Sequence, residues 1–247
     1  MNNPEPGHEL SEDTLFSGRL RCLQHRQGYR FSIDAVLLAH FLAPKKNDRV
    51  LDLCAGCGVV SLILAYRWPE IGLTALEVQP QLAALIRRNS TENEFSERIR
   101  VVEGDCRQMD TLVAAGSFDC LACNPPYRKV ASGRANPQTE QALARHELLA
   151  DLGAVVQAAA FALKNRGRAA FVYPAARAAT LLATLQSHAF APKRLRVVHS
   201  YPGDTGRLVL LEAVKNGGEE LVILPPLFVY QEKGGEYAPE TASFYLP

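Results

Sequence analysis

The sequence predicts a doubly wound α/β fold built on a mostly parallel, seven-stranded sheet with one antiparallel strand. Short apolar runs alternate with stretches at helical spacing through most of the chain, a pattern typical of a parallel sheet with helices on both faces. The last two apolar runs are joined only by residues 201–206. This connection is too short for a crossover helix, so the last two strands should pair antiparallel.

The elements follow from the spacing of apolar residues. Strands are expected near 49–54, 72–76, 99–103, 118–123, 167–173, 193–199 and 207–214, and helices near 33–43, 59–67, 80–93, 152–164 and 175–188. The first thirteen residues are polar and acidic, and we expect them to be frayed. The predicted organisation is a polar lead (1–14), a strand and helix extension (15–48), a main domain (49–215) and a C-terminal extension (216–247).

The first motif is the segment 49–58, Arg-Val-Leu-Asp-Leu-Cys-Ala-Gly-Cys-Gly, which predicts a strand, a glycine turn and the start of a helix. Gly56 and Gly58 let the backbone approach a ligand, and the helix N-terminus offers N–H groups to an anion. Ser61 stands where the dinucleotide fingerprint has its third glycine. A nicotinamide or flavin cofactor is therefore disfavoured.

Acidic residues end the next two strands. Glu77 lies about 25 residues past Asp52, where doubly wound folds place an acid on ribose hydroxyls. Asp105 follows the third strand, whose end could meet an adenine edge. Any one of these acids could be solvated loop charge. Three of them at the ends of successive strands, followed by Asn124 at a fourth, predict a nucleoside-binding site.

The most informative motif is Asn124-Pro125-Pro126-Tyr127, which follows the apolar run 118–123. The two prolines fix φ and remove two N–H donors, so the turn is stiff and its carbonyls have no local donor. Asn124 adds a second acceptor, and Tyr127 an aromatic face for a planar base. These four catalytic candidates predict methyl transfer to an sp2 or amide nitrogen. The alternative is an ordinary proline turn.

Together these motifs resemble the class I S-adenosylmethionine-dependent methyltransferases that modify amino groups. Three further segments resemble, more narrowly, the bacterial tRNA(Val) adenine-N6 methyltransferase family: 27–39 (Gln-Gly-Tyr-Arg-Phe-Ser-Ile-Asp-Ala-Val-Leu-Leu-Ala), 144–147 (Ala-Arg-His-Glu) and 224–230 (Leu-Pro-Pro-Leu-Phe-Val-Tyr). The resemblance spans about residues 15–240. In that family the glycine loop usually reads Asp-Leu-Gly-x-Gly-x-Gly. Here Cys54 replaces the first glycine and Cys57 a small polar residue.

The resemblance implies a Rossmann-like fold, S-adenosylmethionine as cofactor, and N6-methylation of an RNA adenine, in particular adenosine 37 in the anticodon loop of tRNA(Val). It implies cofactor contacts from Tyr29, Phe31, Asp34, Asp52, Cys54, Ala55, Gly56, Gly58, Glu77, Val78, Asp105, Cys106 and Asn124. The substrate would be bound by Arg128, Lys129, Arg134 and Arg145. A monomer with no metal and no membrane partner is expected.

Three other functions would share some of these motifs. The release-factor glutamine methyltransferases also carry Asn-Pro-Pro-Tyr, but they normally show a Pro-Arg-Pro-Glu-Thr-like segment before the glycine loop, where this chain reads Ser-Ile-Asp-Ala-Val-Leu at 32–37. A methyltransferase acting on DNA or ribosomal RNA stays open, although no added target-recognition domain is visible. A non-enzymatic RNA-binding module is opposed by the intact acids and by Asn124.

Basic residues are unevenly distributed. Between Leu152 and Gly203 there is no acidic residue, whereas seven basic ones occur: Lys164, Arg166, Arg168, Arg177, Lys193, Arg194 and Arg196. This basic flank would suit a phosphate backbone, although the alternative is an ordinary solvated face. The loop 128–137 is also basic, and we expect RNA there. His146 is expected to be a structural, capping residue rather than a base.

The six cysteines include two pairs, Cys54/Cys57 and Cys120/Cys123, with the spacing of a four-thiolate metal site. We reject a metal site because Cys120 and Cys123 lie within one strand and should point to opposite faces. Cysteine serves instead as a small apolar filler in a reduced compartment. A redox-sensitive cofactor pocket is the alternative, since Cys54, Cys57, Cys106 and Cys123 fall near the carboxyl ends of strands.

Composition agrees with this assignment. At 247 residues, 47% hydrophobic and 21% charged, the chain can bury a full core and is not disordered. The net charge of +1 says little about partners. Apolar runs stay below membrane-spanning length, and the start lacks the regions of a signal peptide, so we expect a cytoplasmic protein.

Overall fold

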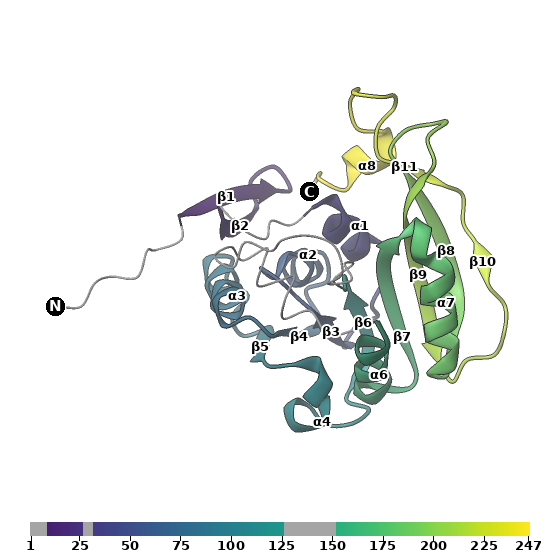
Figure 1. Cartoon of the computed structure of the whole chain (residues 1–247). Helices are drawn as coiled ribbons and strands as arrows, with labels where there is room; N and C mark the ends of the chain where they lie inside the picture. The colour runs from purple at the N-terminus through teal and green to yellow at the C-terminus, as the bar shows by residue number, and fades with distance from the viewer. Residues whose placement is uncertain (1–8, 27–31, 126–151) are drawn as a thin grey trace, which may run out of the picture.

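A computed structural model of the chain describes residues 9–26, 32–125 and 152–247 (Figure 1). Its main sheet has nine strands, ordered β10-β8-β9-β7-β6-β3-β4-β5, with β11 also paired to β8. Neighbouring strands from β7 to β5 are parallel, and β9 pairs antiparallel with both β7 and β8. The prediction of a mostly parallel sheet with one reversed strand is therefore confirmed, and β9 is the reversed strand. The sheet has two strands more than the seven expected, because the short β10 and β11 add to β8.

The structure gives the following bounds. The strands are β1 (Leu10–Leu15), β2 (Leu20–His25), β3 (Arg49–Leu53), β4 (Gly72–Glu77), β5 (Ile99–Glu103), β6 (Phe118–Cys123), β7 (Leu163–Pro174), β8 (Phe190–His199), β9 (Gly206–Lys215), β10 (Val222–Ile223) and β11 (Leu227–Phe228). The helices are α1 (Ile33–Phe41), α2 (Val59–Arg67), α3 (Pro80–Glu92), α4 (Met109–Leu112), α6 (Leu152–Ala162), α7 (Ala178–Ser187) and α8 (Pro239–Ser243), with 3₁₀ turns η1 (Cys106–Gln108) and η2 (Ala175–Arg177).

Helices cover both faces of the sheet, as a doubly wound fold requires (Figure 1). Helices α1, α2 and α3 pack with the β1–β2 hairpin in one apolar cluster, and α6 and α7 pack with η1 and α4 in the other. The central strands are apolar on both faces because both are covered, and Leu51, Leu53 and Leu121 are fully buried. This is why sequence periodicity located these strands readily.

Two predicted helices begin or end elsewhere. Helix α6 ends at Ala162 rather than near 164, because Leu163 already pairs with Phe118 as the first residue of β7. The helix expected at 175–188 is split into η2 and α7, with Arg177 as the N-cap of the longer part. Neither change alters the order of the strands.

Residues 10–13, expected to be frayed, instead belong to β1, and that expectation is wrong for them. Strand β1 pairs antiparallel with β2, with Leu10 opposite His25 at one end and Leu15 opposite Leu20 at the other. The acidic residues of β1 are balanced by neighbours, since Glu12 accepts hydrogen bonds from the Arg21 guanidinium on β2. Polar residues on an exposed hairpin face are ordinary, but they conceal the strand from a search for apolar runs.

Helix α3 binds the outer edge of this hairpin with two asparagines. Asn89 accepts a hydrogen bond from the Leu23 amide at 2.8 Å and donates to the Leu23 carbonyl at 2.9 Å. Asn93 makes the same two bonds to Arg21, at 2.9 and 2.7 Å. The two asparagines are four residues apart on the helix, a rise of about 6 Å, and Arg21 and Leu23 are two residues apart on the strand, about 6.8 Å. The asparagines are therefore spaced like the main-chain groups that they bind.

The C-terminal extension returns to the carboxyl end of β8. Strands β10 and β11 pair parallel with β8, and α8 follows beside β11 (Figure 1). The His40 ring on α1 stacks on Phe244, with ring centroids 4.4 Å apart, so the tail also contacts the helix that follows the N-terminal hairpin. None of the helices in the described part of the chain is long and apolar enough to cross a membrane.

Candidate active site

The predicted site residues gather at one edge of the sheet because their strands are parallel neighbours. In the order β6-β3-β4-β5, Leu53 is level with both Leu76 and Cys123, and Glu77 with Glu103. The carboxyl ends of the four strands therefore meet at the same edge. This reactive edge carries the glycine loop, Glu77, Asp105 and Asn124.

The glycine loop between β3 and α2 has three residues with positive φ. They are Cys54 (64°), Gly56 (58°) and Gly58 (85°). Gly58 could not be replaced without strain, because a Cβ there would lie 2.9 Å from Cγ2 of Ile86 on α3. The Cys54 conformation is one that glycine adopts freely, in keeping with the glycine expected at this position from the family resemblance. Cysteine at this position stores strain of about 1–2 kcal/mol.

Glu77 fixes the shape of that loop. It is 5% exposed, and its carboxylate accepts hydrogen bonds from the Gly56 amide at 2.8 Å and the Gln79 amide at 3.0 Å. Burial raises the pKa of Glu77 to about 7, although the backbone donors act in the opposite direction. The carboxylate is therefore the link between β4 and the turn of the glycine loop.

Asp52 is the second buried acid, on β3 immediately before the loop. Its Oδ2 accepts hydrogen bonds from the Ser61 amide at 3.0 Å and the Ser61 hydroxyl at 2.7 Å. Burial raises the pKa of Asp52 to about 6, and the bonds from Ser61 lower it in part. Ser61, which replaces the third glycine of the dinucleotide pattern, thus holds the acid against α2.

Asp105 ends the third strand in a more open place. It caps η1 by accepting from the Arg107 amide at 2.9 Å, and the Arg107 guanidinium binds both of its oxygens. This contact keeps the pKa of Asp105 below its usual range. Val78, directly after Glu77, is 36% exposed, whereas Cys106 is buried. Asp105 and Val78 therefore place one carboxylate and one exposed apolar side chain at the ends of β5 and β4.

Asn124 and Pro125 follow β6 at the same edge, and Pro125 is buried. Asp34 lies in the first turn of α1. Other predicted site residues lie outside the described residues: the catalytic candidates Pro126 and Tyr127, the cofactor candidates Tyr29 and Phe31, the substrate candidates Arg128, Lys129, Arg134 and Arg145, and the structural candidate His146. Their roles stay predictions.

Sequence reasoning missed Asn89, which is fully buried on α3. Besides its bonds to Leu23, its amide donates to the Cys57 carbonyl in the glycine loop at 3.0 Å. One side chain therefore ties the N-terminal hairpin to the loop. The sequence held a signal, because Asn89 continues the apolar stripe of Leu82 and Ile86 at helical spacing.

The cysteines divide between the two cores. Cys120 belongs to the cluster on one face of the sheet and Cys123 to the cluster on the other, which confirms that they point apart. Cys54 hydrogen-bonds to Cys106 and Cys123, and burial contributes to pKa values above the usual range for all three thiols. Protonated, buried thiols are poor nucleophiles, which favours the filler interpretation over a redox-sensitive pocket.

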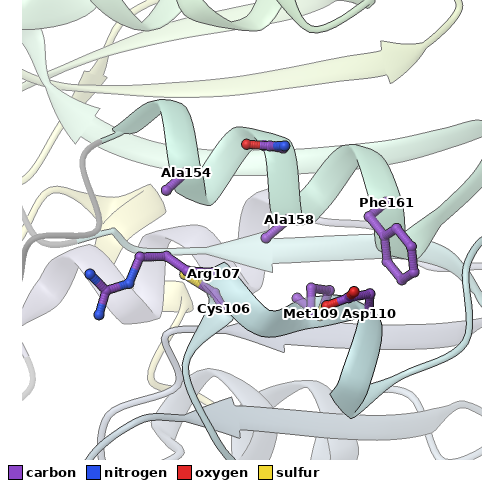
Figure 2. Close-up of a pocket in the computed structure, with 8 residues that line it drawn as sticks. Cys106, Arg107, Met109, Asp110, Ala154, Ala158 and Phe161 are labelled. Atoms are coloured by element: carbon purple, nitrogen blue, oxygen red, sulfur yellow. The ribbon is translucent and has the colours of Figure 1, made fainter.

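A groove of about 360 Å³ runs beside the reactive edge (Figure 2). It lies between η1 and α4 on one side and α6 on the other, with Arg107 at one end and Phe161 at the other. Of the predicted cofactor residues that the structure describes, only Cys106 lines it. The groove therefore adjoins the predicted nucleoside site and does not coincide with it.

All seven basic-flank residues have partners within the fold, and the Arg177 guanidinium lies over the Tyr173 ring, 5.4 Å from its centroid. Lys164 pairs with Asp119, Arg168 with Asp48, Arg194 with Glu212 and Arg196 with Glu240, while Arg166 and Lys193 donate to main-chain carbonyls. Lys164, Arg166 and Arg168 also lie at the start of β7, at the edge of the sheet opposite Asn124. The structure favours a structural role for these residues over phosphate binding.

Comparisons with known proteins agree with the geometry of the reactive edge. The model of the methyltransferase small domain family matches residues 30–173, which include the glycine loop and the proline turn. A tRNA1(Val) (adenine(37)-N6)-methyltransferase from Porphyromonas gingivalis is 29% identical over 189 residues, 74% of this chain and 73% of that protein. One of the same name from Bacteroides thetaiotaomicron is 29% identical over 220 residues, 86% of this chain and 89% of that protein.

A solved structure supports the fold independently. The crystal structure of a predicted O-methyltransferase from Agrobacterium tumefaciens superposes with a TM-score of 0.70 at 22% identity. The superposition covers 86% of this chain and 95% of that one. At this level of identity the similarity concerns the Rossmann-like arrangement of the sheet and helices.

Proposed function

This chain belongs to the methyltransferase small domain family, and on that premise we propose that it transfers the methyl group of S-adenosylmethionine to N6 of an adenine in RNA. The finer assignment that we propose is adenosine 37 in the anticodon loop of tRNA(Val), the position named for the two relatives. The observation that carries the proposal is the meeting of Asp52, Glu77, Asp105 and Asn124 at one edge of the sheet. We assign the chemistry to residues 49–215, with 15–48 and 216–247 as extensions.

The fit to the cofactor can be judged from the acids. Each carboxylate oxygen of Glu77 accepts one amide hydrogen bond and keeps acceptor capacity for a ribose hydroxyl. Helix α2 begins after Gly58 with no side-chain cap, so its N-terminus suits the amino-acid carboxylate of the cofactor. Two buried acids with raised pKa values also suit a ligand that carries a sulfonium and an ammonium.

The adenine of the cofactor would lie at the ends of β4 and β5. Asp105 is held ionised by Arg107, and its remaining acceptor capacity suits an exocyclic amino group. Val78 offers an exposed apolar surface for the flat ring, and the buried Cys106 lines the adjoining groove. We propose Tyr29, Phe31 and Asp34 as further cofactor contacts.

Asn124 and Pro125 would hold the amino group that is methylated. The lone pair of adenine N6 is delocalised into the ring, so the nitrogen attacks well only when its two hydrogens are held. The Asn124 Oδ1 and the Pro125 carbonyl would accept those hydrogens and direct the nitrogen toward the methyl carbon. S-adenosylmethionine supplies an electrophilic methyl group, so no base is required before attack. Positioning of this kind lowers a barrier by up to about 7–11 kcal/mol in favourable cases.

The target base must leave its stack to reach the turn, and this favours an unpaired loop over a duplex. Tyr127 would stack on the extruded base, for about 1–3 kcal/mol. Arg128, Lys129, Arg134 and Arg145 would contact phosphates around it. These roles rest on the sequence and the family.

The test is incubation of the purified protein with methyl-labelled S-adenosylmethionine and unmodified total tRNA, followed by nucleoside mass spectrometry. Label in N6-methyladenosine is expected. Release factor, ribosomal RNA and DNA are offered in parallel. Label in glutamine of the release factor, or in DNA, would overturn the RNA assignment while keeping the transfer chemistry.

A matched pair of variants tests the turn itself. Asn124→Ala should abolish transfer and leave the dissociation constant for S-adenosylmethionine near that of the wild type. Asn165→Ala, at the opposite edge of the sheet, is the control and should be fully active. An Asn124→Ala protein that retained most of its activity would refute the assigned role.

A further inference from the structure

Three tyrosines of the C-terminal extension form a continuous stack. The ring centroids of Tyr230 and Tyr237 are 5.3 Å apart with planes 17° from parallel, and those of Tyr237 and Tyr245 are 5.3 Å apart with planes 5° from parallel. Tyr245 also hydrogen-bonds through its side chain to Tyr237. The rings therefore share one orientation and present a series of parallel faces.

The stack has a rigid base. Tyr230 and Tyr237 face each other across an antiparallel bridge, closed by the Gln231 amide to the Glu236 carbonyl and the Ala238 amide to the Val229 carbonyl, both at 2.9 Å. On the far side, Thr241 donates to the Phe228 carbonyl at 2.9 Å, and Glu240 pairs with Arg196 of β8. A binding surface on such a base would lose little conformational freedom when occupied.

The stack is also fixed to the reactive edge. The Val229 amide donates to the His199 carbonyl at 2.9 Å, and the Tyr230 amide to the Ser200 carbonyl at 2.8 Å, at the carboxyl end of β8. In Figure 1 the tail lies beyond the end of β8 that carries the β8–β9 connection. Strand β8 is three positions from β6 in the sheet, a distance of about 14 Å. That span corresponds to a few nucleotides of an unpaired strand.

Exposure distinguishes these rings from the core aromatics. Tyr230 and Tyr237 are each 37% exposed, whereas Phe171, Tyr173 and Phe190 are at most 2% exposed. Clustered, partly exposed aromatic side chains on a rigid base are typical of interaction surfaces. The charges beside them are mixed, with exposed Glu232, Lys233 and Glu236 in the same hairpin. This surface therefore lacks the charge bias of a phosphate site and offers flat faces instead.

We propose that Tyr230 and Tyr237 form a stacking platform for an unpaired base of the RNA substrate, a few nucleotides from the base that is methylated. The inference rests on the proposed function, and it adds a contact that none of the predicted substrate-binding residues supplies. An unpaired RNA base is the occupant that fits, because any base presents a π-face to an aromatic ring and single-stranded RNA is commonly held in this way. Tyr230 ends the stack and takes the base, while Tyr237 and Tyr245 keep its ring in place.

The test uses the full chain and an unmodified tRNA transcript. Tyr230→Ala should raise KM for tRNA by about 5- to 150-fold, the range that loss of one base–aromatic stack produces. The turnover number, the dissociation constant for S-adenosylmethionine and the melting temperature should stay close to the wild-type values. The increase should be the same at low and high salt, because no phosphate contact is lost.

Three companion variants separate stacking from folding. Tyr230→Phe keeps the ring and should behave as the wild type. Tyr230→Leu keeps apolar bulk without a flat ring, so it should share the KM defect and replaces the alanine variant if that protein misfolds. Ile223→Ala, at a 71% exposed position earlier in the same extension, is the matched control and should leave KM unchanged.

The outcomes distinguish this proposal from the proposed function. If the wild-type protein methylates tRNA and the KM values of Tyr230→Ala and Tyr230→Leu stay within twofold of the wild-type value, the platform is overturned and the proposed function stands. The same holds if the tyrosines prove to bind a protein partner instead of RNA. If the wild type methylates no RNA, the proposed function falls, and fluorescence anisotropy of a labelled hairpin RNA with an unpaired loop decides the platform. Binding that Tyr230→Ala weakens would support it, and binding that is equal or absent in both proteins would overturn it.

Discussion

The Oε2 atom of Glu77 accepts a hydrogen bond from the Gly56 amide at 2.8 Å, so the acid proposed to hold the ribose also holds the glycine loop in shape. The acid is buried, and Asp52 is close enough to raise its pKa further. Two nearby acids that are costly to ionise would destabilise the protein without ligand at high pH. The cofactor site therefore couples pH, stability and affinity.

Glu77 should make the ligand-free protein less stable as the pH rises. Its pKa in the folded protein, about 7, lies above the value of 4.5 expected when it is unfolded. Its stabilising contribution is therefore complete below about pH 4.5 and is lost as the pH rises through 7, for a total of about 3 kcal/mol. The free energy of unfolding in urea, measured from pH 5 to 8, should fall less steeply in Glu77→Gln than in the wild type. Equal slopes would contradict the burial of this charge.

Ser61→Ala should destabilise the protein more at pH 8 than at pH 5. The variant removes the 2.7 Å bond from the hydroxyl to Asp52, and a bond to a buried carboxylate is worth about 1.5–3 kcal/mol. At pH 5 Asp52, with a pKa of about 6, is mostly protonated and the loss should be smaller. Denaturant unfolding at both pH values measures this. Ser90→Ala is the control, since the hydroxyl of that buried serine donates to the Ile86 main-chain carbonyl rather than to an acid, and its effect should not depend on pH.

Asn89→Leu should lower both stability and affinity for S-adenosylmethionine. The leucine leaves the Leu23 amide and the Leu23 and Cys57 carbonyls without their present partner, a loss of about 3 kcal/mol or more. Because the Cys57 carbonyl belongs to the glycine loop, calorimetric affinity for the cofactor should fall as well. Asn93→Leu removes the equivalent bridge at a half-buried position and should cost about 1 kcal/mol with unchanged affinity. Similar effects of the two variants would refute the link.

Cys54 should tolerate glycine better than valine. Its φ of 64° costs glycine nothing, so Cys54→Gly should stay within about 1 kcal/mol of the wild type, with relief of strain offsetting lost packing. Cys54→Val places a β-branched residue in the same conformation and should cost about 2 kcal/mol or more. Thermal unfolding compares the three proteins. A valine variant as stable as the wild type would show that the loop relaxes readily.

The sheet could be predicted because β3, β4 and β6 are buried on both faces and therefore appear as short apolar runs. The reactive edge could then be predicted from the sheet, because parallel strands place their carboxyl ends at the same edge for any conformation of the loops. Hairpin β1–β2 could not be predicted in this way, because β1 reads Leu-Ser-Glu-Asp-Thr-Leu and depends on Arg21 of its partner strand for charge balance. Its stability lies in tertiary contacts that no local pattern records.

The basic flank shows the same limit. Arg168 and Arg194 are far apart in sequence, yet both pair with Glu212 on β9, and Arg196 pairs with Glu240 in the tail. The absence of acids nearby in the sequence suggested an unbalanced surface, whereas the balancing acids arrive from strands and helices elsewhere. Asn89 is the converse case, since its place on an apolar helical stripe is a local signal of burial that the sequence analysis did not use, while its partners could come only from the structure.

The route of the tail also protects the sheet. Because β9 runs in reverse, the chain leaves it at the edge opposite Asn124 and must travel back along β8 to reach Tyr230. On that route β10 and β11 pair with β8, and Pro225 and Pro226 between them offer no amide donors to another molecule. Removal of the tail would expose a ten-residue strand edge to self-association. The segment that carries the tyrosines thus also serves as a guard against aggregation.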